Sequence, residues 1–117
     1  MSTLKADTIQ STGGGAATLT NQQAAKCGSA HGTDAVLDSG FNVSSITDQG
    51  TGTFDTNYTN NFSAAINVYS STRFGTSTIG FTYILSTTTS SHRVDSAGHA
   101  GSMQDKPVSS TVHGDLA

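Results

Sequence analysis

This chain of 117 residues is poor in the residues that usually stabilise small proteins, with one cysteine, one proline and no tryptophan. Because Cys27 is the sole cysteine, an intrachain disulfide is excluded, and we expect an inert thiol. Only 11% of residues are charged, and the five lysines and arginines stand singly, which argues against nucleic-acid binding. No apolar run approaches the roughly 18 residues of a membrane helix, and the N-terminal tract lacks an apolar signal region. We therefore expect no membrane insertion.

Large apolar side chains are also scarce. Leu, Ile, Val and Phe together form less than about a fifth of the chain, whereas Ser, Thr, Gly, Asn and Gln form about half. A chain of this size with so thin a core usually needs a disulfide, a metal or oligomerisation. The composition therefore favours assembly with further copies of the same chain.

The patterns typical of catalysis and metal binding are missing. The histidines have no H-x-H or H-x-x-H spacing, so we interpret them as solvent-facing loop residues: His31, His92, His99 and His113. A metal on a trimer axis, held by one histidine from each chain, stays open as an alternative. No G-x-S-x-G motif precedes a helix, and the triple glycine at 13–15 lacks the Lys-Ser/Thr of a phosphate loop. We expect no catalytic, cofactor or metal site and no enzymatic activity.

Composition divides the chain into an arm and a head. Residues 1–19 are predicted to form an extended arm with a glycine joint. Residues 20–28 are the one helical candidate, because Thr20 and Gln23 fit a capping box and Gly28 supplies a stop. We therefore divide the chain into residues 1–28, an arm, glycine joint and short helical neck at which identical chains would meet, and residues 29–117, a β-sandwich head.

From about residue 33 the pattern is typical of β-strands. Segments 41–44 and 54–58 alternate apolar and polar residues around a glycine-rich turn at 47–52, which predicts a hairpin. Segment 79–85 is the clearest strand, and Ile84 opposite its apolar row indicates burial on both faces. Weaker strands are expected near 92–95 and 108–112. Six to eight short strands predict an all-β, antiparallel β-sandwich or jelly-roll-like domain.

The aromatic residues admit two interpretations. Most of them are expected in the core, because the apolar pool is too small to spare many. The alternative is that five of them form a surface on which sugars stack: Tyr58, Phe62, Tyr69, Phe74 and Tyr83.

Several segments resemble one family. Residues 1–10 with the Thr-Leu-Thr-Asn at 18–21, the hairpin segment 38–52, its continuation at 54–65 and the C-terminal His-Gly-Asp-Leu-Ala are similar to tail-fibre-like virion proteins of marine bacteriophages. The likeness is good over residues 1–65 and weaker between 68 and 112. It implies a homotrimeric protein, synthesised in the host cytoplasm and placed on the virion tail or capsid exterior.

The resemblance implies a short tail fibre or adhesin that helps attach the particle to a host-surface glycan or protein receptor. Two alternatives are a capsid decoration (head-fibre or cement) protein and a tail or baseplate component without adhesive activity. The resemblance also implies that residues 1–28 serve in virion attachment or trimerisation, with other virion structural proteins as partners. The candidate residues for this role are Leu4, Ile9, Leu19 and Gln23. We place receptor contact in loops 71–78, 86–91 and 97–104, with four candidate residues: Arg73, Phe74, Thr88 and His99.

Overall fold

The computed structural model describes residues 12–13, 25–65, 67–74 and 80–117. The regular structure in these ranges is entirely β, in eight strands. They are β1 (Cys27–His31), β2 (Leu37–Phe41), β3 (Val43–Gly50), β4 (Thr53–Tyr58), β5 (Val68–Arg73), β6 (Gly80–Thr87), β7 (Ser91–Gly98) and β8 (Val108–His113).

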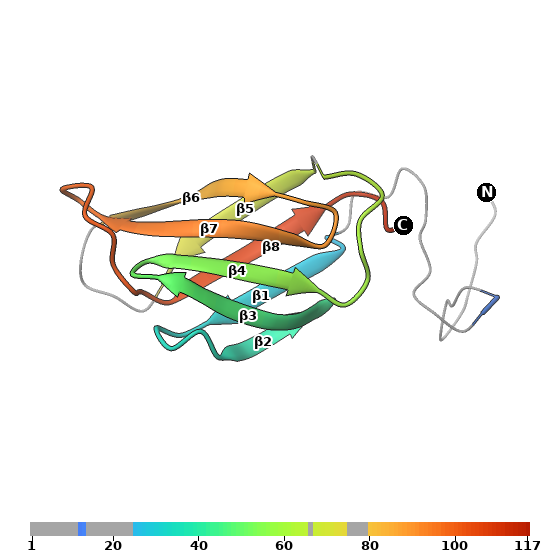
Figure 1. Cartoon of the computed structure of the whole chain (residues 1–117), viewed down its shortest axis with the longest axis horizontal. Coiled ribbons are helices and arrows are strands. Elements are labelled where there is room, and N and C mark those ends of the chain that lie inside the picture. Colours follow the sequence, from blue (N-terminus) through green and yellow to red (C-terminus); the bar gives the residue numbers. More distant parts are fainter. Residues whose placement is uncertain (1–11, 14–24, 66, 75–79) are drawn as a thin grey trace, which may run out of the picture.

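The strands form two antiparallel four-stranded sheets (Figure 1). The first sheet has the order β2-β1-β8-β5 and the second the order β3-β4-β7-β6. Side chains from the two sheets meet between them: the His31 ring of β1 lies 4.6 Å from the Phe54 ring of β4, centroid to centroid. The prediction of an all-β, sandwich-like domain is therefore confirmed.

The predicted hairpin is present as β3 and β4. Val43 pairs with Tyr58 and Asp48 pairs with Phe54, and the chain reverses through Gly50 and Gly52, both at positive φ. The turn is shorter than predicted, because Thr47 and Asp48 still belong to the ladder.

The core is small and follows strand alternation. On β4, Phe54, Thr56 and Tyr58 point inward and are buried, while the residues between them are half-buried. One cluster joins Cys27, Tyr58, Phe62 and Val112, and Tyr69 and Leu116 pack against it. The scarcity of apolar residues therefore appears directly as a core in which histidine, serine and threonine are also buried.

Three sequence predictions are corrected. The helical turn expected over residues 20–28 does not include Cys27 and Gly28, which pair with Val112 and Thr111 of β8. His31 and His92 are buried, contrary to the expectation of solvent-facing histidines, because they sit on the inward face of β1 and β7. The strand predicted at 79–85 is not buried on both faces, because its apolar residues Phe81, Tyr83 and Leu85 are exposed. Residues 20–24 of the expected helical turn, together with Leu4, Ile9, Leu19 and Gln23, lie outside the described residues.

Candidate functional site

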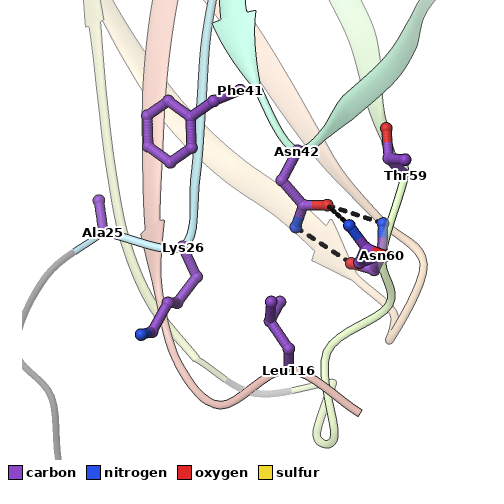
Figure 2. A pocket seen from close by; sticks show the side chains of 7 residues that line it. All are labelled: Ala25, Lys26, Phe41, Asn42, Thr59, Asn60 and Leu116. Carbon is purple, nitrogen blue, oxygen red and sulfur yellow. Dashed lines mark hydrogen bonds between the residues drawn. The ribbon is translucent and has the colours of Figure 1, made fainter. Parts of the chain in front are cut away.

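A groove of about 370 Å³ opens at the end of the sandwich where β1 begins, and Figure 2 shows the side chains that line it. We call it the end groove. It is lined by Ala25, Lys26, Phe41, Asn42, Thr59, Asn60 and Leu116. Its size suits a small ligand.

Two asparagines form the polar wall of the end groove. Asn42 adopts a left-handed φ of 55°, a conformation that asparagine tolerates better than most residues. The Asn42 Nδ2 donates to the backbone carbonyl of Asn60 (3.1 Å). The Asn42 Oδ1 accepts from the Asn60 backbone N–H (2.7 Å) and from its side-chain Nδ2 (3.1 Å). The two amides are thus fixed against one another, with one Nδ2–H on each and Asn60 Oδ1 left for other partners.

The apolar wall consists of Phe41 and Leu116. Phe41 is 52% exposed, and its ring lies against Gly28, where an added Cβ would approach the ring to 2.6 Å. Glycine at position 28 therefore makes room for this ring on the sheet surface. The end groove combines an aromatic wall with fixed amides, an arrangement suited to binding and without an evident nucleophile or acid–base pair.

A second surface lies on the outer side of the second sheet, along β6 and β7. Directly paired residues in an antiparallel ladder point to the same face. Phe81 pairs with Ala97, and Tyr83 pairs with Asp95. Because Val94 and Ser96 of β7 are buried in the sandwich interior, Asp95 and its neighbours of the same parity face outward. We call Phe81, Tyr83, Arg93 and Asp95 the aromatic face.

The two rings of the aromatic face lie side by side. Phe81 is 48% exposed and Tyr83 is 41% exposed, with ring centroids 6.3 Å apart and planes inclined by 31°. A hydrogen bond with Asp95 is the main cause that raises the pKa of the Tyr83 phenol above its ordinary value. The rings therefore form a shallow floor that carries a hydroxyl.

Charged groups border this floor. Asp95 is only 5% exposed, and its Oδ1 has no hydrogen-bond partner in the part of the chain that the structure describes. Arg93 makes a two-pronged ion pair with Asp55, Nε to Oδ1 at 2.6 Å and Nη2 to Oδ2 at 2.8 Å. Hydrogen bonding to Asp55 is also the main cause that raises the pKa of Arg93.

A chain of buried hydrogen bonds crosses the interior between the sheets. Tyr58 OH lies 2.9 Å from His92 Nδ1, His92 Nε2 lies 2.9 Å from Ser110 Oγ, and Ser110 Oγ lies 2.8 Å from Ser29 Oγ. Burial lowers the pKa of His92 to about 4, so the imidazole is neutral at pH 7. A serine–histidine contact is typical of an activated nucleophile, but Ser110 is buried between the two sheets. We therefore assign this chain of contacts to packing.

The predicted receptor residues are not brought together. β6 and β7 pair from Gly80–Gly98 at one end to Thr87–His92 at the other. Thr88, exposed in the β6–β7 turn, therefore lies at the opposite end from His99, as Figure 1 shows for the two loops.

Two of these residues differ in their exposure. The Arg73 guanidinium donates from Nη1 to the Ala97 carbonyl (2.6 Å) and lies 3.4 Å from Gln104 Oε1, so it connects the two sheets instead of facing solvent. Phe74, the next residue, is 42% exposed. Of the proposed sugar-stacking group, Tyr58 and Phe62 are core residues, whereas Phe74 and Tyr83 are exposed.

Sequence reasoning missed Asp95 and Arg93 as surface-site residues. Their parity opposite His92 and Val94 was a usable signal, but their position beside Tyr83 depends on the β6–β7 register. Asn42 and Asn60 were also missed, because the contact between them spans 18 residues.

No cluster of three or more His, Cys, Asp or Glu that could hold a metal ion occurs among the residues with described positions. Within the same residues, no helix is long and apolar enough to span a membrane. Comparison with protein-family models, curated proteins and solved structures found no match.

Proposed function

We propose that this chain is a bacteriophage virion structural protein, a homotrimeric short tail fibre or adhesin that helps attach the particle to a glycan or protein on the bacterial surface. The resemblance of several sequence segments to tail-fibre-like virion proteins motivates the proposal. The β-sandwich supports it only as a suitable scaffold, because one fold serves many functions.

The exposed aromatic face is the observation that carries the adhesive part of the proposal. Two aromatic rings and two charged side chains stand on a rigid sheet surface, where a binding site is better positioned than on a loop. The end groove is less suited to receptor contact, because Ala25 and Lys26, which belong to the segment 1–28 assigned to attachment, lie in its wall. Under this proposal the arm and the end groove face the particle.

The homotrimeric part is supported by the thin core and by other exposed side chains. Three large hydrophobics outside β6 are more than half exposed, a distribution that favours burial against further copies: Val36, Phe41 and Val68. Binding through several weak contacts at once would then give the particle its avidity.

The decisive experiment is competition for adsorption. The purified chain, added in excess, should slow adsorption of the phage that encodes it. A capsid decoration protein would leave adsorption unchanged and be present in hundreds of copies per particle, whereas a tail protein would number a handful to a few tens. A tail component without adhesive activity would have the low copy number and no effect on adsorption.

A second experiment separates arm from head. Deleting residues 1–19 should leave a folded trimer by native mass measurement that no longer joins the virion. Incorporation of the shortened chain into particles would contradict the arm assignment, and a stable monomer of the full chain would contradict the shared core.

A further inference from the structure

We propose that the aromatic face binds carbohydrate: pyranose rings stack on Phe81 and Tyr83 while Asp95 and Arg93 hydrogen-bond their hydroxyl groups. This inference rests on the proposed attachment function and names the receptor class, a surface saccharide, together with the residues that contact it.

The floor of the site is formed by the two rings. Pyranose rings have an apolar face of C–H groups that packs on the negatively charged face of an aromatic ring. The Phe81 and Tyr83 rings are adjacent, inclined by 31°, and each is close to half exposed, so a flat ligand can cover both. The small, buried Ala97 lies beside Phe81 on the same face, because the two residues pair directly.

The border of the site supplies planar hydrogen-bonding groups. Asp95 is more than nine-tenths buried on the same face as Tyr83, and its Oδ1 has no partner among the described residues. A buried acceptor without a partner is costly, and a bound donor satisfies it. Arg93, fixed by Asp55 through Nε and Nη2, retains further N–H donors.

The charge of the aromatic face disfavours a second copy of the chain as the occupant. The centres of interfaces between proteins are depleted in charge, whereas this face holds Arg93 and Asp95 beside its rings. The carboxylates of Asp95 and Asp55 disfavour polyanions such as nucleic acid.

The test is titration of the full chain with a panel of neutral tetrasaccharides (cello-, manno-, galacto- and chito-tetraose), followed by NMR of the aromatic side chains. We expect at least one probe to shift the Phe81 and Tyr83 ring signals, with the signals of the buried Phe54 ring unchanged. Phe81→Ala and Tyr83→Ala should each weaken binding tenfold or more, and Asp95→Asn several-fold.

Val36→Ala is the control, because Val36 is an exposed hydrophobic residue (57%) outside the aromatic face. It should bind as the native chain does, and thermal unfolding of every variant verifies folding. Binding by none of the probes, or equal loss in Val36→Ala, would overturn the inference. Loss of the trimer in a folded Phe81→Ala variant would overturn it in favour of an interface between copies.

The outcomes separate this inference from the proposed function. If the chain blocks phage adsorption but binds no tetrasaccharide, the attachment function is supported and the carbohydrate site is refuted. If it binds saccharide through Phe81 but does not affect adsorption, the carbohydrate site is supported and the attachment function is refuted.

Discussion

His92 Nε2 on β7 and Ser110 Oγ on β8 lie 2.9 Å apart in the interior, and this contact joins the second sheet to the first. With Tyr58 on the other imidazole nitrogen, both ring nitrogens are paired. A neutral imidazole donates through one nitrogen and accepts through the other, which matches this position. The chain thus fills part of its interior with a satisfied polar group where larger domains use aliphatic side chains.

Stability should depend on pH through His92. Its pKa is lowered to about 4 by burial, and nearby His31 adds to the lowering while Asp55 opposes it. The unfolded histidine titrates near 6.5, so the unfolded state binds the extra proton first as pH falls. The free energy of unfolding should therefore drop by about 2 kcal/mol between pH 7.5 and 5. Urea unfolding at both values measures it.

The control for the pH effect is His92→Gln, which lacks the titrating group. It should lose clearly less stability than the native chain over the same pH interval. An equal pH dependence in the two proteins would show that other groups cause the effect.

Tyr58→Phe should destabilise the fold by about 1–2 kcal/mol, because it leaves His92 Nδ1 without its partner in a buried site. Tyr69→Phe is the comparison, since its hydroxyl makes a longer bond, 3.3 Å, to the Ala65 carbonyl from a half-buried position. Chemical denaturation should rank Tyr58→Phe as the more damaging change; the reverse order would contradict the assigned contact.

The Cys27 thiol should be unreactive in the folded protein. The side chain is buried in the core cluster, and burial raises its pKa to about 12, so almost no thiolate exists at pH 8. A disulfide reagent such as Ellman's reagent should label Cys27 only as fast as the chain opens, and at full rate in denaturant. Rapid labelling under native conditions would show that the β1 region is open.

Gly52→Ala should be strongly destabilising, and Gly101→Ala is its matched control. Both glycines have a similar positive φ, 73° and 79°, which costs alanine about 1–2 kcal/mol. At Gly52 an added Cβ would also approach the Ser96 carbonyl oxygen to 2.5 Å and the Gln104 nitrogen to 2.7 Å, whereas nothing lies within 4 Å at Gly101. The Gly52 variant should therefore show the greater loss of thermal stability. Equal losses of thermal stability in the two variants would mean that the β3–β4 turn rearranges to accommodate the added Cβ without cost.

Much of the fold followed from local pattern. The β3–β4 hairpin was predictable because alternation and glycines act over a few residues, and so were the β6 and β8 strands. Strand β1 was not predicted, since Cys27 and Gly28 are held in it by β8, more than 80 residues later in the chain. At these two residues the helical turn expected from local pattern is overridden by long-range pairing.

The candidate surface was less predictable than the fold. Alternation separates the two faces of β6 but does not say which is covered, and Phe81 and Tyr83 proved to be on the open one. The same ambiguity placed His92 wrongly outside.

The sequence by itself determined an all-β domain with a thin, polar core, because composition and alternation act locally. The tertiary structure decided that His92 meets Ser110 inside and that Asp95 meets Tyr83 outside. Both contacts depend on strand register and on sheet stacking, which bring together residues that no local pattern relates.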